Sequence, residues 1–355
     1  MFPATTITRG LIAALLASSP ALSSPTPQPP NDNPSPLPLP VHTIAQFPVG
    51  TWIENIAVRS NGDLLVTSLF PNASLYTIAN PSSRSPSVSR LFTVGAAPVA
   101  GSITGLLGIT EVTHDYFVFV NIDLGNNTQG LWGVDFNTPY SSPPKPHLLV
   151  SFPNSSGLPN GATTLPGSDR IVFVADSGLG LIWRVDIVAK SLSVALQVPE
   201  TNHTGPAPAS IGANGVHVHE GYLYWTNTEH VALYRVKITS QGWPVPGAAV
   251  ETVKVFTPGA AAVDDFAFGP GGRDVAWVLT PVENTLMAVG LDLDGRSVAV
   301  AGSVDSSAVA KGTAAQFGRT ARDKEVLYVV TGGDSVGGTE EGGKVVAVDT
   351  RGFHF

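Results

Sequence analysis

The chain has 355 residues and contains no cysteine. Without cysteine there are no disulfides, thiolate nucleophiles, cysteine-ligated zinc sites or iron–sulfur clusters. Charged residues are also few, at 13%, and the net charge is −8. Lysines and arginines are scattered along the chain, which argues against nucleic acid or an anionic membrane as partner.

Long helical patterns are missing too. No 3.6-residue apolar period continues over the length of a helix, whereas glycine (37) and proline (30) are abundant. That combination indicates an all-β chain with many turns. The sequence also lacks a Walker loop, a dinucleotide-binding glycine fingerprint and an H-E-x-x-H motif.

The N-terminus has the layout of a secretory signal. Arg9 precedes the apolar run Leu11–Leu16, which is too short to span a bilayer, and small residues follow. We interpret residues 1–23 as a signal peptide, with a disordered tail as the alternative. Residues 24–40 are proline-rich and are expected to form an extended linker without a packed core. Four glycosylation sequons in predicted loops support export to the secretory pathway and secretion: Asn72, Asn126, Asn154 and Asn202.

One pattern recurs about every 50 residues from residue 41 to the C-terminus. A polar residue with small or apolar neighbours starts a strand, a turn follows, and an apolar β-run comes next. Repeats of this length are typical of propeller blades. The sequence therefore predicts a six-bladed β-propeller over residues 41–355. The copies begin at Glu54, Thr104, Asn160, Asn214, Asp264 and Ala314.

A lone strand, Val41–Val49, precedes the first full repeat. We predict that it joins the last blade, around KVVAVD, and closes the ring.

The first strands of all blades meet at the propeller axis. Their polar residues should therefore converge on one central pocket: Glu54, Thr104, Asn160, Asn214, Asp264 and Gln316. Carboxylate and amide oxygens in one place suit a hard divalent cation such as Ca²⁺. The alternative is that these side chains satisfy buried backbone groups, and that the repeated Asn-Gly pairs serve only as turns.

Histidines and aromatics flank these positions. His217 and His219 share one strand face, so either could bind metal or transfer protons, or could belong to the core. The aromatics could line a ligand pocket or pack neighbouring blades together: Trp52, Trp225, Phe266 and Phe268. Ser335 lies in a G-x-S-x-G pattern, but the strand–turn–helix context of a nucleophile is missing.

The spacing of Glu54, Pro159-Asn160-Gly161, Asn214-Gly215-Val216 and Asp264-Asp265-Phe266-Ala267 resembles the senescence-marker-protein/gluconolactonase family, with strictosidine-synthase-like propellers as more distant relatives. The resemblance implies divalent-cation ligands at Glu54, Asn160, Asn214 and Asp264. Two departures are visible, because the family's Glu-Gly-Pro is Glu54-Asn55-Ile56 and its Asp-Gly-Met is Asp264-Asp265-Phe266.

A stronger resemblance is to exported fungal propellers, on the phrases LPNGATTLP, IGANGVHVHEGYLYWTNT, DDFAF and GTAAQFGRTARDKEVLYVVTGG. That subgroup includes hetero-Diels–Alderases of tropolone–sesquiterpene biosynthesis. The resemblance implies that an o-quinone methide is joined to a humulene-type alkene, with small apolar substrates as partners and no required cofactor. Candidate hydrogen-bond donors are Asn160, Asn214 and His217.

The remaining candidates would bind substrate: Trp52, Glu54, Thr104, Trp225, Asp264, Phe266 and Gln316. A metal-dependent lactonase and a non-catalytic secreted binding propeller are the alternatives.

Overall fold

The computed structural model describes residues 36–95, 102–137, 144–153, 157–205, 210–269, 274–293, 295–333 and 335–355. The predicted signal peptide and most of the proline-rich segment lie outside them. The described residues form strands, turns and one short 3-10 helix, η1 (Pro199–Thr201). They contain no α-helix, and hence no helix that is long and apolar enough to cross a membrane.

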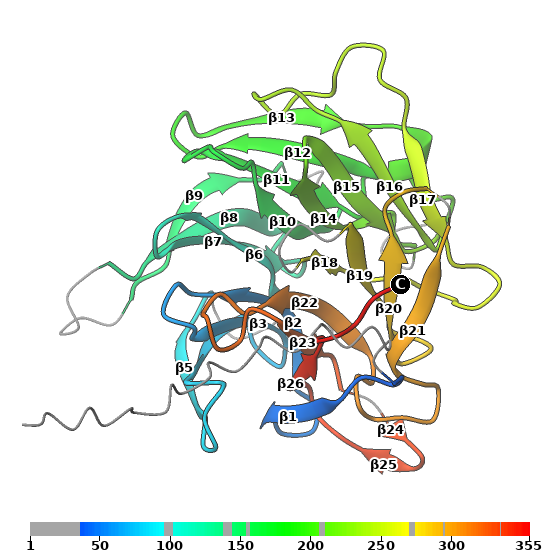
Figure 1. The fold of residues 1–355 in the computed structure, drawn as a ribbon. Coiled ribbons are helices and arrows are strands. Elements are labelled where there is room, and N and C mark those ends of the chain that lie inside the picture. Colours follow the sequence, from blue (N-terminus) through cyan, green and yellow to red (C-terminus); the bar gives the residue numbers. More distant parts are fainter. Residues whose placement is uncertain are drawn as a thin grey trace, which may run out of the picture. The chain divides into compact units, whose positions relative to one another are not determined.

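Six four-stranded antiparallel sheets make up the fold, and all belong to the unit Pro34–Phe355 (Figure 1). Blade 1 consists of β2 (Trp52–Val58), β3 (Leu64–Phe70), β4 (Ser74–Ala79) and β5 (Ser87–Thr93). Blade 2 consists of β6 (Thr104–Thr113), β7 (Tyr116–Asp123), β8 (Thr128–Asp135) and β9 (His147–Ser151). Blade 3 consists of β10 (Pro159–Thr164), β11 (Ile171–Asp176), β12 (Leu181–Asp186) and β13 (Ser191–Leu196).

Blade 4 consists of β14 (Ala213–His219), β15 (Tyr222–Asn227), β16 (Ala232–Lys237) and β17 (Glu251–Val255). Blade 5 consists of β18 (Phe266–Phe268), β19 (Val275–Thr280), β20 (Thr285–Gly290) and β21 (Ser297–Gly302). Blade 6 consists of β22 (Gly312–Phe317), β23 (Val326–Thr331), β26 (Lys344–Asp349) and β1 (Val41–Gln46). The first strand of each blade contacts the first strands of both neighbours, in a closed cycle from β2 to β22 and back to β2. The predicted six-bladed propeller is confirmed.

Blade 6 contains strands from both ends of the chain. Its order is β1-β26-β23-β22, and β1 pairs antiparallel with β26. The predicted closing strand is therefore confirmed. The expectation that residues 24–40 contain no core residue is wrong at their end: Leu39 is buried, and its backbone N–H donates to the carbonyl of Val300 at 2.7 Å.

The hydrophobic core consists of six clusters, and each cluster fills the space between two neighbouring blades. The core aromatics lie here. Trp225 is fully buried between blades 3 and 4, where it stacks on Tyr234 with ring centroids 5.7 Å apart. Phe266 is fully buried between blades 4 and 5. Blade packing, rather than substrate binding, is therefore the role that the structure gives to Trp225 and Phe266.

The pairing of β2, β6, β10, β14 and β22 with their second strands is irregular near the start of each strand. Such bulges re-aim a side chain out of the regular alternation. Gly161 and Gly215 lie at these bulges, and a Cβ on either would come within 2.5 Å of an atom of the next blade. The Asn-Gly pairs at these two places thus permit close approach of inner strands around the axis, and they are not turns.

Outside the blades, β24 (Ser335–Val336) and β25 (Thr339–Glu340) form a small hairpin. Ser335 therefore lacks the strand–turn–helix that a nucleophile elbow requires, as expected.

Candidate functional site

Alignment of the six strand pairings shows which residue of each inner strand occupies the polar-ring position. The equivalent residues are Glu54, Leu107, Asn160, Asn214, Asp264 and Thr313. Thr104 lies three residues before this position and Gln316 three residues after it. Both were assigned to the ring from sequence, and both assignments are wrong. The cause is the bulges, which shift the count between the polar residue and the following apolar run.

Four of the predicted ring residues converge on one cavity of about 520 Å³, which we call the acidic cavity. Its polar lining consists of Glu54, Asn160, Asn214, Thr228, Asp264 and Lys311, together with the indole of Trp52. Its other walls are mainly aliphatic, and include Leu69, Ile103, Leu107, Ile122, Leu158 and Val263. A largely apolar hollow with a few convergent polar groups is the usual form of a small-molecule site.

Both carboxyls of the acidic cavity, Glu54 and Asp264, have raised pKa values. Burial raises the pKa of Glu54 to about 7, the charge of Asp265 adds to the rise, and a hydrogen bond from Trp52 Nε1 to Glu54 Oε2 opposes it. The pKa of Asp264 is also raised well above its usual range, by burial and then by the charges of Glu54 and Asp265, against a hydrogen bond from Asn214. Perturbed carboxyls in a cleft are typical of functional sites.

Each of the two ring amides, Asn160 and Asn214, is held by a hydroxyl group that also donates to a backbone carbonyl. The Nδ2 atom of Asn160 donates to Ser177 Oγ at 3.3 Å, and this hydroxyl donates to the carbonyl of Ala213 in the next blade at 2.7 Å. The Nδ2 atom of Asn214 donates to Thr228 Oγ1 at 3.0 Å, and that hydroxyl donates at 2.8 Å to the carbonyl of Val263, which precedes β18. Each amide is thereby fixed against the neighbouring blade, with its oxygen available to a ligand.

Two carboxylates and two amide oxygens are a donor set that fits a hard cation such as Ca²⁺. Burial and mutual repulsion penalise the two negative charges. A divalent cation held by Glu54, Asn160, Asn214 and Asp264 would remove that repulsion. Such an ion, when bound, polarises a carbonyl oxygen.

A second hollow of about 320 Å³, which we call the polar cavity, is lined by residues further along the same inner strands. Its polar lining is Asn55, Thr110, Glu111, Thr163, His217, Gln316 and Arg319. The expectation of a single convergent pocket is therefore wrong. His217 and Gln316 line the polar cavity, and His217 does not share a cavity with Asn160 and Asn214.

Asp265 is the centre of a hydrogen-bonded group beside the polar cavity. His217 Nε2 lies 2.9 Å from Asp265 Oδ1, and Asn55 Nδ2 donates to Asp265 Oδ2 at 3.0 Å. Asn55 and Asp265 are the two residues that replace glycines of the senescence-marker-protein pattern. Each follows a ring residue, and together they bond blade 1 to blade 5. The two sequence departures therefore form one contact, and Asn55 also lines the polar cavity.

The structure places the other predicted residues apart from the acidic cavity. Thr104 is buried at the start of β6, beside the carboxyl of Asp123. Of the sequon residues, Asn126 and Asn202 are exposed, Asn72 is half-buried, and Asn154 lies outside the described residues. Glycosylation stays a prediction.

Lys311 was missed from sequence. Its Nζ lies 5.1 Å from the ring centroid of Trp52, and its backbone is fixed by Asn284 Oδ1 at 2.8 Å and by Gly332. It precedes β22 by one residue, so only its position before the last inner strand could have indicated it. Among the described lining residues, it is the one cation of the acidic cavity.

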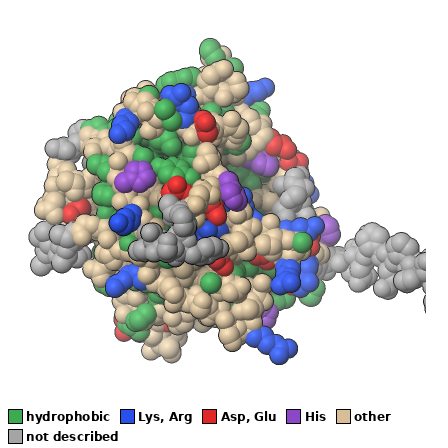
Figure 2. All heavy atoms as spheres, turned by 90° about the vertical axis from the view of Figure 1, so that its left-hand side faces the viewer, with side chains coloured by type: hydrophobic (Ala, Val, Ile, Leu, Met, Phe, Trp, Pro, Cys, Tyr) green, Lys and Arg blue, Asp and Glu red, His purple; other side chains and the backbone are tan. Residues whose placement is uncertain are grey.

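On the face in Figure 2, lysine and arginine side chains are scattered rather than gathered in one patch. That view agrees with the scattered basic residues of the sequence.

Comparison with known proteins gives two close relatives by sequence. The chain is 31% identical over 347 residues to "Putative hetero-Diels-Alderase asR5" of Sarocladium schorii, covering 88% of this chain and 84% of the relative. The chain belongs to this hetero-Diels-Alderase family. A second member, "Putative hetero-Diels-Alderase" of a Phoma species, is 30% identical over 310 residues, covering 80% of this chain and 84% of that protein. Membership supports a pericyclase-like function.

No family model matches the chain. Among solved structures, the calcium-binding protein regucalcin of Agrobacterium tumefaciens has a TM-score of 0.59 at 14% identity, covering 90% of this chain and 97% of its own. A luciferin-regenerating enzyme has a TM-score of 0.61 at 13% identity, covering 88% and 96%. These likenesses show the fold, that of senescence-marker-protein/gluconolactonase-like six-bladed propellers.

Proposed function

We propose that the chain catalyses an intermolecular hetero-Diels–Alder reaction in the acidic cavity, between an o-quinone methide and a humulene-type sesquiterpene alkene of fungal secondary metabolism. The observation that carries the proposal is the construction of this cavity. It has about 520 Å³ of space, aliphatic walls from several blades, and a few polar groups, among which Trp52 contacts both Glu54 and Lys311. Family membership supports the reaction class.

The aliphatic walls would hold the alkene and exclude water. A hetero-Diels–Alder addition forms one C–C bond and one C–O bond, releases no atom and needs no redox cofactor. The catalyst therefore has to align two neutral reactants, and alignment alone can supply several kcal/mol through effective molarity. Water would otherwise add to the quinone methide, so a dry cavity also protects the reactant.

The polar side would orient the quinone methide and stabilise charge on its oxygen. That oxygen gains electron density when the C–C bond forms ahead of the C–O bond. Asn160 uses one amide hydrogen for Ser177 and has a second one to donate. The ammonium of Lys311 lies over Trp52 at the same side. Donors fixed before the reaction stabilise such charge effectively.

Asn214 would act mainly by placing Asp264 and closing this side of the cavity, since its amide already bonds Thr228 and Asp264. His217 has no part in the proposal, because it lines the polar cavity and is bound to Asp265.

We further propose that the protein acts along the secretory route. The N-terminal layout of the sequence supports this, as do the exposed sequon residues Asn126 and Asn202. A loss of mass on endoglycosidase treatment of the secreted protein is the expected result.

The decisive experiment measures stereochemistry as well as rate. The protein is incubated with a quinone-methide precursor and a humulene-type alkene, and the enantiomeric composition of the adduct is compared with a protein-free control. We expect an excess of one stereoisomer, which is reduced in Trp52→Ala and retained in Gln316→Ala, a matched control in the polar cavity. A racemic adduct identical to the control would contradict the proposal.

The fit of the ring to Ca²⁺ favours a metal-dependent lactonase as the second candidate. Cleavage of a simple lactone that EDTA abolishes, without any stereochemical bias in the cycloaddition, would establish the lactonase instead.

A further inference from the structure

The second histidine of the VHVH segment takes part in neither cavity. His219 ends β14, and its ring stacks on Phe268 with centroids 4.4 Å apart and 19° between the planes. Its Nε2 atom is buried and has no hydrogen-bond partner among the described residues. A buried imidazole nitrogen without a partner loses its interaction with water and gains nothing in exchange, so it calls for an explanation.

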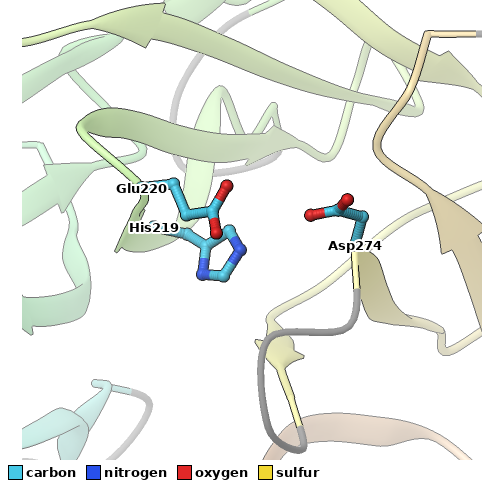
Figure 3. Close-up of side chains that lie close together, drawn as sticks. All are labelled: His219, Glu220 and Asp274. Carbon is cyan, nitrogen blue, oxygen red and sulfur yellow. The ribbon is translucent and has the colours of Figure 1, made fainter.

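Two carboxylates lie beside this ring. Figure 3 shows Glu220 next to His219 at the end of the β14–β15 hairpin, and Asp274 facing them across a gap. One ligand atom from each residue lies within 4.8 Å of those of the other two. Asp274 directly precedes β19, so the three residues belong to blades 4 and 5.

Within the described part of the chain, neither Glu220 nor Asp274 has an ion-pair partner. Among the described residues, Arg235 lines a hollow of about 190 Å³ together with Glu220, Asp274 and Asp292. Its guanidinium is already used: Nε binds Glu251 at 2.6 Å, and Nη1 donates to the Tyr224 hydroxyl at 3.0 Å and to the Leu291 carbonyl at 3.1 Å. Among the described residues, therefore, no cation pairs with either carboxylate.

We propose that His219, Glu220 and Asp274 form a binding site for a divalent transition metal of the zinc type. One imidazole and two carboxylates are three protein ligands, which leaves a position for water or another ligand. The imidazole favours zinc-type ions, whereas Ca²⁺ prefers an all-oxygen set such as the ring.

The three ligand atoms must move closer together to bind zinc. Zinc bonds to nitrogen and oxygen of about 2.1 Å place tetrahedral ligand atoms about 3.4 Å apart. Glu220 and Asp274 are exposed, so their side chains can approach the fixed imidazole. Bound metal would connect blade 4 to blade 5, whose inner strand β18 has only three residues (Phe266–Phe268).

The backbone conformation of Glu220 allows its carboxylate to be removed without disturbing the turn. Glu220 and Gly221 have φ of 46° and 78°, the left-handed pair of a two-residue hairpin turn in which Asn-Gly is preferred. Glu220→Asn should therefore keep the turn while removing the carboxylate.

Blade 2 supplies a matched control. His114 and Asp115 lie in the equivalent β6–β7 turn, and Asp115 has φ of 53°. There, however, Arg59 binds the carboxylate at 2.9 Å, so no uncompensated charge remains for a metal.

The test is calorimetric titration of the full chain with ZnCl₂, with excess Ca²⁺ present to occupy the ring. We expect one saturable site. Loss of a direct ligand should cost at least the ~10–100-fold that is typical of changing a ligand's hydrogen-bond partner. His219→Phe, which preserves stacking on Phe268, and Asp274→Asn should therefore bind Zn²⁺ at least ~10-fold more weakly. His114→Phe should bind like the wild type.

Glu220→Asn should melt at or above the wild-type temperature without metal and show a smaller shift on adding Zn²⁺. Absence of saturable binding in the wild type would overturn the proposal. Equal affinity in folded His219→Phe or Asp274→Asn would overturn it as well. None of these results depends on cycloaddition activity.

Discussion

The acidic and polar cavities are built from the same inner strands, and ring residues such as Asn214 are only three positions from residues of the polar cavity such as His217. The two cavities differ in whether their carboxylates have partners that balance the negative charge. Beside the polar cavity Asp265 is bonded by His217 and Asn55, and in the cavity lining Glu111 is paired with Arg319.

In the acidic cavity Glu54 and Asp264 repel one another, and burial raises the pKa of both. A satisfied polar network stabilises the folded chain, whereas uncompensated charge beside apolar walls costs stability and is kept for a ligand. The comparison therefore favours the acidic cavity as the ligand site, and variants in both cavities can test this proposal.

The largest expected effect is on the pH dependence of stability. The pKa of Glu54 is about 7 in the folded state, against 4.5 ordinarily. The folded protein therefore holds this proton more tightly than the unfolded chain, and wild-type stability falls as pH rises from 4.5 through 7. The shift corresponds to about 3 kcal/mol. Urea unfolding in EDTA should show Glu54→Gln gaining about this much on wild type by pH 8. Parallel curves of unfolding free energy against pH for the two proteins would contradict the raised pKa of Glu54.

The next effect is on catalysis. Asn214→Ala removes the amide that bonds Asp264 and Thr228 at the polar side of the acidic cavity. We expect cycloaddition to slow by ~30-fold, about 2 kcal/mol, and the stereochemical excess to fall. Gln316→Ala, in the polar cavity, should leave both unchanged. Equal losses in the two variants would mean that both cavities serve the reaction.

His217→Ala should affect stability more than product. It leaves buried Asp265 with one partner fewer, so unfolding should require about 1–2 kcal/mol less, by urea denaturation at pH 7. The stereochemical composition of the adduct should match wild type. A change in product composition with unaltered stability would return His217 to the reaction.

The smallest effect is that of Ca²⁺. If the ring binds the ion, Ca²⁺ at ten times its Kd stabilises wild type by about 1.4 kcal/mol. Asp264→Asn should lose most of this gain, and Glu111→Gln in the polar cavity should retain it. No thermal shift between EDTA and Ca²⁺ in wild type would leave the ring as a ligand site without metal.

The sequence predicted the fold well, because period-2 apolar runs at blade spacing and the lone strand Val41–Val49 have one sensible arrangement. It also predicted four of the residues that line the acidic cavity, namely Glu54, Asn160, Asn214 and Asp264, through their shared place before an apolar run. It failed where backbone pairing is irregular. Bulges moved the ring position in blades 2 and 6, so Leu107 and Thr313 occur there instead of Thr104 and Gln316.

The bond that joins blade 1 to blade 5 could not be predicted, for a different reason. It links Asn55 to Asp265, which are 210 residues apart. Each was noticed as a bulky replacement of glycine, but only three-dimensional pairing shows that the two replacements depend on one another. Trp225 and Phe266 were ambiguous because a buried aromatic has the same sequence pattern whether it faces a ligand or a neighbouring blade.

The pairing of β1 with β26 has a consequence for how the chain is made. Val41 pairs with Val348, so the ribosome must add about 300 residues between the two halves of this contact. At ~5–20 residues per second this takes about 15–60 s, during which the first strand has no partner. Five blades can form in order as they emerge, but the ring stays open until β26 has been synthesised. A premature stop before Lys344 would therefore leave five blades complete and the propeller unclosed.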